Sequence, residues 1–393
     1  MDIRIVDYQS TTAAGINVAA LRTAIKQQSS GLRYNKFPNC DIDTYVGQVQ
    51  QIEDIELGAW QSRNNALAAL GLEQGSIMPN IKSLISKYSA HRIGIAIGSS
   101  TASIDRTEYA YQELNDGKLS EHFKQPEIHH PGAPSQFIAY YTGIRGPAVT
   151  VNTACSSSAK VFATASRWLS SGITDAVLVG GVDSLCLSVL YGFHSLQLLS
   201  SQKCRPFDRE RDGINLGEAS AYALLTRPDP SIRDSGICLL GYGESSDAHH
   251  MSHPHPEGLG AKLAIEQALA SAQLSYDDID YINLHGTASR ANDAIEGKLI
   301  SNMFTKDTLC SSTKALTGHT LGASGITEAL IAIDSMKQNI APASSNLDTL
   351  DIELDFTIVK KNIKKNLHHV MSNSFGFGGN NCCLVFGKAP QQT

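Results

Sequence analysis

Residues 149–159 read Val149-Thr150-Val151-Asn152-Thr153-Ala154-Cys155-Ser156-Ser157-Ser158-Ala159. The β-branched residues predict a short strand, the polar residues a tight turn, and the small residues a helix that runs to about Ser171. Cys155 would stand at the N-terminus of this helix, where unpaired N–H groups and the helix dipole favour the nucleophilic thiolate. The same N–H groups could hold the oxyanion formed when the sulfur attacks a thioester. The stretch alone also allows Cys155 to be a small buried core residue.

The sequence on both sides of this stretch alternates between strands and helices. Apolar runs at Arg92–Gly98 and Ala176–Gly181 predict strands that are buried on both faces. Because the cysteine helix lies between them, they imply a right-handed parallel crossover. Residues 237–393 repeat a similar layout, including a small-residue helix from about Ala323 to Lys337. The prediction is an α/β protein of two pseudo-repeated halves, residues 1–236 and 237–393.

Composition limits the class of protein. The 393-residue chain has a net charge of -6, with 42% hydrophobic and 18% charged residues, which argues against broad nucleic-acid binding. No signal peptide and no apolar stretch of about 18 residues is visible, so we expect no membrane insertion. The eight cysteines are scattered and include no CxxC, which suits free thiols in a reducing compartment. A cytoplasmic location is expected.

Three later stretches carry chemical groups near expected strand ends. His285 directly follows the strand around Tyr281–Leu284, at the edge where open α/β sheets place their sites. Lys314 and His319 stand five residues apart around a glycine turn, and residues 373–381 are rich in glycine. A lone histidine at a strand end is more often structural. A cysteine, two histidines and a lysine together favour a catalytic site.

Four motifs resemble the signatures of the 3-oxoacyl-[acyl carrier protein] synthases, the type II ketosynthases of the thiolase superfamily. They are Ala154-Cys155-Ser156-Ser157, His285-Gly286-Thr287, Lys314 to His319, and Asn373-Ser374-Phe375-Gly376-Phe377-Gly378-Gly379. They occur in family order and span most of the chain. The resemblance implies a decarboxylating condensing enzyme with the five-layered α-β-α-β-α thiolase fold, acting as a dimer.

The resemblance also implies roles for the site residues. Cys155 would take an acyl group from acyl carrier protein, and the backbone N–H groups of Cys155 and Phe375 would form the oxyanion hole, with Phe375 as gate. His285 and His319 would donate hydrogen bonds to the malonyl thioester carbonyl and stabilise the enolate left by loss of carbon dioxide. Lys314 would help to keep both histidines neutral.

Further positions match the family more loosely. Thr287 and Ser289 match hydroxyl positions that contact the pantetheine arm. Asp293 and Glu296 match acidic positions of the Lys314 network, although a structural role is equally open for both. No cofactor and no metal are expected, since the substrates are carried on the phosphopantetheine of acyl carrier protein.

Departures from the family pattern suggest which member this is. Arg290 stands where proline is common and Asn380 where threonine is common. The chain is more similar to ketosynthases of aryl polyene pathways, which implies an aryl-polyenyl acyl group in a pocket lined by Tyr191 and Phe193. The partner would be a second copy or a chain-length-factor homologue. Two alternatives stay open: a housekeeping fatty-acid ketosynthase, and a non-catalytic chain-length-factor subunit, against which the intact Cys155 argues.

Other signals have simpler explanations. Four histidines within residues 249–255 could suggest a metal, but prolines interrupt the segment and no cysteine or carboxylate has ligand spacing. The loop 376–379 is no dinucleotide-binding loop, because a strand and not a helix follows it. Four lysines could dock an acidic carrier protein or simply belong to solvated faces: Lys82, Lys87, Lys118 and Lys124.

Overall fold

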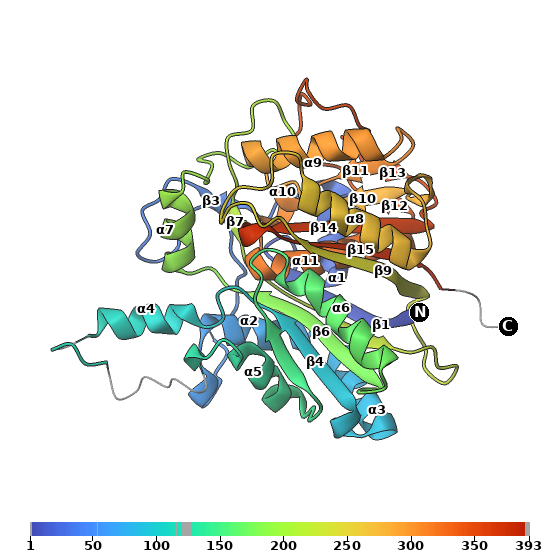
Figure 1. Cartoon of the computed structure of the whole chain (residues 1–393). Coiled ribbons are helices and arrows are strands. Elements are labelled where there is room, and N and C mark those ends of the chain that lie inside the picture. The colour runs from blue at the N-terminus through green and yellow to red at the C-terminus, as the bar shows by residue number, and fades with distance from the viewer. Residues whose placement is uncertain (1, 53, 115, 120–127, 390–393) are drawn as a thin grey trace.

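The computed structural model describes residues 2–52, 54–114, 116–119 and 128–389, and its layers alternate between helices and sheet (Figure 1). One outer layer contains α2 (Arg63–Leu72), α3 (Ile77–Tyr88) and α5 (Ala133–Thr142), and the other contains α8 (Leu259–Ala272) and α9 (Arg290–Met303). The middle layer contains α1 (Val18–Gln27), α6 (Ser157–Ser170) and α11 (Ser324–Gln338). This confirms the five-layered α-β-α-β-α prediction.

The strands form two groups of five. In spatial order the first group is β5 (Ala148–Val151), β4 (Ile93–Gly98), β6 (Ala176–Asp183), β8 (Ala219–Thr226) and β1 (Ile3–Thr12). The second is β11 (Leu309–Ser311), β10 (Tyr281–Asn283), β14 (His369–Gly376), β15 (Asn380–Lys388) and β9 (Ile237–Ser246). A short antiparallel pairing of Ile3 with Leu239 and of Arg4 with Cys238 joins the groups into a ten-stranded sheet.

The two groups have the same topology. Numbered along the chain within each group, the strands lie in the order third, second, fourth, fifth, first. In both groups the first three strands in this spatial order run parallel to one another, and the two pairings that follow are antiparallel. This repeated topology supports an internal duplication. The boundary between the two halves, placed between residues 236 and 237, stays a prediction. It lies between the end of β8 at Thr226 and the start of β9 at Ile237.

The remaining elements are short or peripheral. They are β2 (Arg33–Tyr34), β3 (Tyr45–Gly47), β7 (Leu216–Gly217), β12 (Ile340–Ala341), β13 (Ile363–Lys364), α4 (Ile104–Gln112), α7 (Leu187–Ser195) and α10 (Lys314–Thr317). The 3-10 turns are η1 (Gly58–Trp60), η2 (Ala90–Arg92), η4 (Tyr276–Asp278), η5 (Leu321–Ala323) and η6 (Phe377–Gly379). Over the described residues, no helix combines the length and apolar character that crossing a membrane requires.

Close packing of α6 against α11 positions the site. A Cβ on Gly325 of α11 would lie only 2.5 Å from the Ala159 nitrogen of α6, so glycine is needed for this approach. The first turns are also linked, since the Ile326 N–H donates to Ser158 Oγ at 2.9 Å. The N-termini of the two central helices therefore meet, and so do the segments that precede them.

Candidate active site

Cys155 lies in a constrained turn between β5 and α6. Ala154 adopts a left-handed conformation with φ of 51°, which costs a non-glycine residue about 1 kcal/mol or more. The Thr153 N–H donates to Ser157 Oγ at 2.8 Å, which ties the turn to the first residue of the helix. On the other side, a Cβ on Gly376 would lie 3.2 Å from the Cys155 nitrogen. The turn thus directs a 5% exposed thiol into the space between the two halves.

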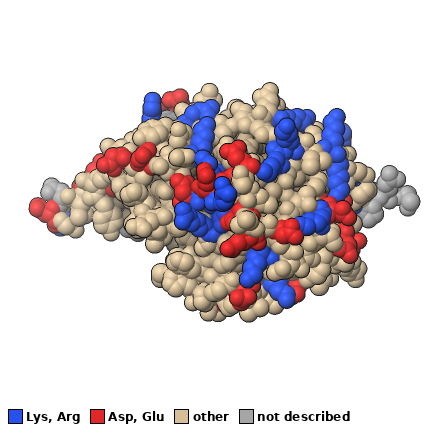
Figure 2. Space-filling model, turned by 90° about the horizontal axis from the view of Figure 1, so that it is seen from above, with Lys and Arg blue, Asp and Glu red and all other residues tan. Residues whose placement is uncertain are grey.

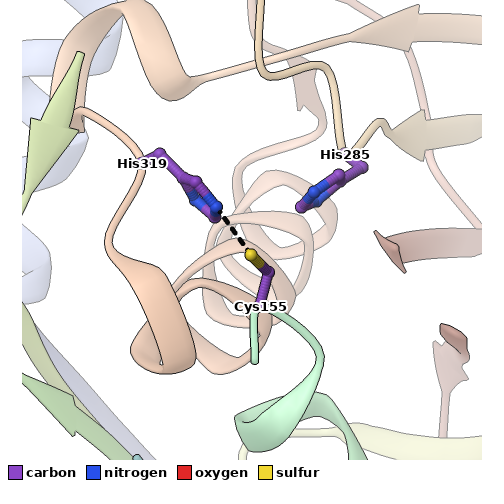
Figure 3. A group of neighbouring side chains, drawn as sticks. All are labelled: Cys155, His285 and His319. Atoms are coloured by element: carbon purple, nitrogen blue, oxygen red, sulfur yellow. Dashed lines mark hydrogen bonds between the residues drawn. The ribbon is translucent and has the colours of Figure 1, made fainter. Parts of the chain in front are cut away.

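Cys155, His285 and His319 form a compact cluster, called the triad below (Figure 3). His319 Nε2 lies 2.9 Å from the Cys155 sulfur, and the two imidazole rings are 5.5 Å apart and nearly perpendicular. One nitrogen of each histidine and the sulfur all lie within 4.8 Å of one another. Since both histidines are only 2% exposed, the three predicted residues meet in a site shielded from water.

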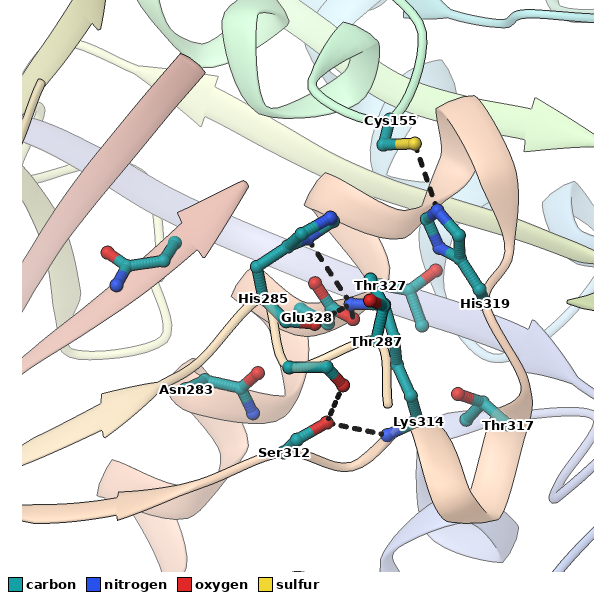
Figure 4. A network of polar contacts seen from close by, with 12 residues as sticks. Cys155, Asn283, His285, Thr287, Ser312, Lys314, Thr317, His319, Thr327 and Glu328 are labelled. Carbon is teal, nitrogen blue, oxygen red and sulfur yellow. Dashed lines mark hydrogen bonds and ion pairs between the residues drawn. The ribbon is translucent and has the colours of Figure 1, made fainter. Parts of the chain in front are cut away.

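Lys314 supports the triad from below (Figure 4). Its ammonium group pairs with Glu328 of α11, donates to the His285 carbonyl oxygen at 2.5 Å and lies 3.5 Å from His285 Nδ1. An ammonium group has no lone pair, so Nδ1 must accept and the ring proton of His285 must sit on Nε2. Lys314 therefore sets the tautomer that makes His285 a hydrogen-bond donor toward the site.

Burial and charge keep both histidines neutral. The pKa of His285 lies well below its usual value because of burial, then because of Lys314 and His319. The pKa of His319 is likewise well below its usual value, through burial and then Lys314. Within the described part of the chain, His319 Nδ1 has no hydrogen-bond partner, so no neighbour fixes its tautomer. His319 can therefore accept or donate a proton at Nε2.

The pKa of Cys155 is raised to about 11, because burial disfavours the thiolate. The Lys314 charge and a hydrogen bond from the Phe377 N–H lower it, but they do not overcome burial. Burial therefore outweighs the groups around Cys155 that favour the thiolate. At neutral pH the sulfur carries its proton, and its reaction requires a base. The nearest is His319.

The structure points to a different oxyanion donor from the one expected, whereas the gate role of Phe375 stays a prediction. The backbone N–H that reaches the Cys155 sulfur belongs to Phe377, not to Phe375. Phe375 lies within β14, where it pairs with Asn381, and its ring packs 6.0 Å from that of His285. The chain leaves the strand only after Gly376 and turns through η6, and this turn directs the Phe377 N–H to the sulfur.

The acidic residues also differ from expectation. Glu296 accepts hydrogen bonds from the His285 and Gly286 N–H groups at 2.9 and 2.8 Å, and Asp293 accepts from the Phe207 N–H at 2.7 Å. Neither is among the ion-pair partners of Lys314 found in the described residues; Glu328 is. Asp293 and Glu296 hold the backbone around His285, because its buried N–H groups need acceptors. The structural reading is therefore favoured for both.

A cavity of about 430 Å³ leads from the triad to the surface, and Thr287 and Ser289 line it beyond His285. The Thr287 hydroxyl donates to Ser289 Oγ at 3.0 Å. Much of the remaining lining is apolar and comes from Phe193, Leu196, Leu198, Ile214, Phe375 and Phe377. The cavity thus combines polar side chains next to His285 with largely apolar walls.

Only one of the two predicted pocket residues lines this cavity. Phe193 does so, and its ring stacks on that of Phe377 with centroids 5.6 Å apart and planes 17° apart. Tyr191 is 41% exposed, is not part of the lining, and donates its hydroxyl to Asp41 at 2.8 Å. Both belong to α7, where residues two apart point to nearly opposite sides, so they could not share a wall.

The triad has the ligand types of a zinc site, a cysteine and two histidines. The ammonium group of Lys314 lies 3.5 Å from His285 Nδ1, and its charge would oppose a divalent cation in the same low-dielectric space. The absence of a metal therefore stays our expectation.

In the histidine-rich segment, residues 249–255, His253 and Pro254 line the cavity, so the segment borders the site.

The lysines considered for docking are dispersed. Lys82 and Lys87 belong to α3, in an outer layer, and Lys87 pairs with Asp229 at 2.5 Å. Lys118 is exposed. Lys124 lies outside the described residues. A carrier-docking role for these lysines stays a prediction.

Two residues that the sequence analysis did not assign contribute to the site. Phe377 stands two positions after Phe375 in the same glycine-rich motif, so the motif pointed to the segment but not to the residue. Glu328 is an acidic residue on a helix of small and apolar residues, all buried from Ser324 to Met336. A buried acid of this kind requires a partner, which is a signal that sequence inspection could have used.

Comparison with known proteins gives consistent matches. Residues 58–230 match the model described as "Beta-ketoacyl synthase, N-terminal domain", and residues 237–348 the corresponding "C-terminal domain". The 3-oxoacyl-[acyl-carrier-protein] synthase 2 of Vibrio harveyi is 32% identical over 361 residues, 86% of each chain. A structure titled "Ketosynthase (ApeO) in Complex with its Chain Length Factor (ApeC)", from Xenorhabdus doucetiae, matches with a TM-score of 0.88, 38% identity and coverage of 99% and 98%. "The ishigamide ketosynthase/chain length factor" has a TM-score of 0.90 at 22% identity over 99% of each chain, which shows the fold alone.

Proposed function

The chain belongs to the beta-ketoacyl synthase family, and we propose that it condenses an aryl-polyenyl acyl group held on Cys155 with malonyl-[acyl carrier protein]. The general activity is that of a 3-oxoacyl-[acyl-carrier-protein] synthase, an acyltransferase that performs a decarboxylative Claisen condensation. The observation that carries the proposal is the triad, in which a thiol and two neutral histidines meet at the end of a largely apolar cavity.

The first step loads the enzyme. His319 Nε2, 2.9 Å from the sulfur, takes the Cys155 proton as the sulfur attacks the acyl thioester of the carrier protein. The backbone N–H groups of Cys155 and Phe377 stabilise the tetrahedral oxyanion. The carbon–sulfur bond to the carrier breaks, and the proton leaves on the carrier thiol. The product is an acyl-cysteine and a free carrier.

The second step generates the carbon nucleophile. His319 first changes tautomer, so that its ring proton moves from Nδ1 to Nε2, which no partner of Nδ1 opposes within the described residues. A malonyl thioester on a carrier then places its carbonyl oxygen against the Nε2–H groups of His285 and His319. Loss of carbon dioxide leaves the electron pair as an enolate on that oxygen, and the two N–H groups stabilise it. Lys314 contributes by holding His285 in the required tautomer. The enolate carbon then attacks the acyl carbonyl, and the Cys155 thiolate leaves and takes a proton from solvent, so the acyl chain is two carbons longer. No step needs a cofactor.

The aryl-polyenyl substrate is supported by two observations. The match to the ApeO and ApeC complex combines 38% identity with nearly full coverage. The stacked rings of Phe193 and Phe377 line the same cavity as Cys155 and provide a flat aromatic wall, which suits a planar conjugated chain. A housekeeping fatty-acid ketosynthase is the alternative for the same chemistry.

The partners follow from the reaction and the neighbours. Acyl carrier protein delivers both substrates, and the enzyme pairs with a second copy or with a chain-length-factor homologue. The similar ketosynthase ApeO forms a complex with its chain length factor ApeC. A non-catalytic partner role for this chain is disfavoured by the intact triad. All eight cysteines are free, which supports a cytoplasmic location.

Intact-protein mass spectrometry tests the proposal. The chain is incubated with one carrier loaded with a straight alkyl chain and one loaded with a hydroxyphenyl-polyene, with Cys155→Ala as control. We expect the polyenyl adduct on the wild type and none on the variant. Preferential alkyl loading would support fatty-acid synthesis instead. No adduct from either carrier would favour the non-catalytic partner role.

A further inference from the structure

Arg290 is a charged residue of the cavity that the reaction above does not use. It is the first residue of α9, it is exposed, and it lines the same cavity as the buried Cys155 and His285. Thr287 and Ser289 line the cavity as well. The segment 285–290 therefore runs from the buried catalytic end of the cavity to its open end, with Arg290 at the mouth.

The Arg290 side chain is anchored through one nitrogen only. Its Nε donates to the Arg211 carbonyl oxygen at 3.4 Å, and Arg211 in turn donates to the Arg290 carbonyl oxygen at 3.3 Å. Arg211 is 5% exposed and pairs with Asp351 at 2.6 Å, so the anchor is rigid. For the two terminal nitrogens of Arg290, the described part of the chain provides no hydrogen-bond partner. The guanidinium group is held in place with its outer donors available.

These donors suit a phosphate. A guanidinium fork matches the oxygens of a phosphate in geometry and charge, and the N-terminal end of the 14-residue helix α9 adds a favourable dipole. A substrate thioester that reaches Cys155 on a pantetheine arm must pass Thr287 and Ser289. The phosphate at the opposite end of that arm then remains at the mouth of the cavity.

We propose that Arg290 binds the phosphodiester of carrier-bound phosphopantetheine and thereby positions the arm for both substrates. The proposal rests on the proposed function. Arg290 is a positioning residue, since it touches no reacting atom.

The surrounding charges make this a local contact rather than a general attraction. Asp212 and Asp247 line the same cavity, and His253 borders it. On the face that carries α9, Lys and Arg alternate with Asp and Glu instead of forming one basic patch (Figure 2). The net charge of -6 would repel an anion at long range. Specific donors must therefore retain the phosphate.

The test compares two small acyl donors that differ only in the phosphate, acyl-phosphopantetheine and acyl-pantetheine, and adds acyl-loaded carrier protein as a third donor. The rate of Cys155 acylation by each donor is followed by intact-protein mass spectrometry with wild type, Arg290→Ala and Arg290→Lys. Arg205→Ala is the control, because Arg205 is a half-buried arginine that pairs with Glu210 and does not line the cavity. We expect the wild type to favour the phosphorylated donor. Arg290→Ala should lose this preference, with an acylation rate about three- to tenfold lower for that donor only.

Each other outcome has a definite meaning. Arg290→Lys should keep part of the preference, and Arg205→Ala should keep all of it. An equal loss of rate with both donors in Arg290→Ala would assign a structural role and overturn the proposal. A loss seen only with intact carrier protein would mean that Arg290 contacts the carrier's own surface instead. If the wild type accepts neither the small donors nor the loaded carrier, the proposed function itself fails. If the wild type is acylated but shows no preference for the phosphorylated donor, only the proposal for Arg290 fails.

Discussion

His319 Nε2 lies 2.9 Å from the Cys155 sulfur, and its Nδ1 has no partner within the described residues, whereas Lys314 fixes the tautomer of His285. The two histidines are therefore not equivalent. His319 can act as a base toward the thiol and later as a donor toward the malonyl carbonyl. His285 can act only as a donor.

This difference predicts different defects for the two alanine variants. His319→Ala should slow acylation of Cys155 by about 10²-fold or more, since the nearest base for a buried thiol is lost. His285→Ala should slow mainly the release of carbon dioxide from malonyl-carrier protein. Intact-mass kinetics measure loading, and labelled carbon dioxide release measures decarboxylation. Similar loading rates in both variants would show that His319 is not the base.

The raised pKa of Cys155 predicts its reactivity toward a small alkylating agent. With a pKa of about 11, the thiolate fraction should increase tenfold per pH unit throughout the range from 7 to 9. The alkylation rate at Cys155 should therefore rise steadily without a plateau. Peptide mapping separates Cys155 from the partly exposed Cys40, and Cys155→Ser supplies the blank. An alkylation rate that stays constant from pH 7 to 9 would mean that the helix N-terminus and Lys314 outweigh burial after all.

The buried Lys314–Glu328 pair predicts a separation of stability from activity. Glu328→Gln should lower the free energy of unfolding by about 3 kcal/mol, because it leaves the 1% exposed Lys314 without its counter-charge. The double variant Lys314→Met with Glu328→Leu removes both charges and should regain most of this stability. Chemical denaturation measures the first effect.

The same double variant should be inactive in decarboxylation although it is stable, since Lys314 no longer holds His285 in its donor tautomer. Full activity in a stable double variant would show that the tautomer does not depend on Lys314. Lys306→Met is a suitable control, because its pair with Asp355 is exposed and should contribute little.

The sequence predicted well what depends on local pattern. The strand and helix around Cys155 follow from β-branched and small residues, and the helix ends at Ser170, one residue before the expected limit. His285 could be found because it comes two residues after β10, and His319 because it follows the glycine that ends α10. The five-layered architecture followed from the family resemblance, not from the local pattern.

Other features depend on tertiary geometry that a sequence does not contain. Whether Phe375 or Phe377 donates to the sulfur depends on where β14 ends and η6 begins. The direction of the Cys155 pKa depends on how completely the second half of the chain covers the thiol. Tyr191 and Phe193 share a motif but not a helix face, and only the position of α7 shows which one reaches the cavity.

Glu296 predicts a pH dependence of stability. Burial raises its pKa to about 7 from a usual value of 4.5, so the folded chain binds a proton that the unfolded chain has released between these two values. This contribution to the free energy of unfolding is therefore largest at acidic pH, and it is lost as pH rises from about 4.5 to 7. His285 and His319, with lowered pKa values, act in the opposite direction.

The contribution of Glu296 is isolated by the difference between wild type and Glu296→Gln, in which the histidine terms cancel. Glutamine can still accept a hydrogen bond from the His285 N–H but does not titrate. The stability of the wild type relative to the variant should fall by about 2 to 3 kcal/mol between pH 5 and pH 8. Denaturant titrations of both proteins across this range measure it. A difference that stays constant with pH would show that Glu296 is already ionised at pH 5, which would mean that its hydrogen bonds to His285 and Gly286 outweigh the cost of burial.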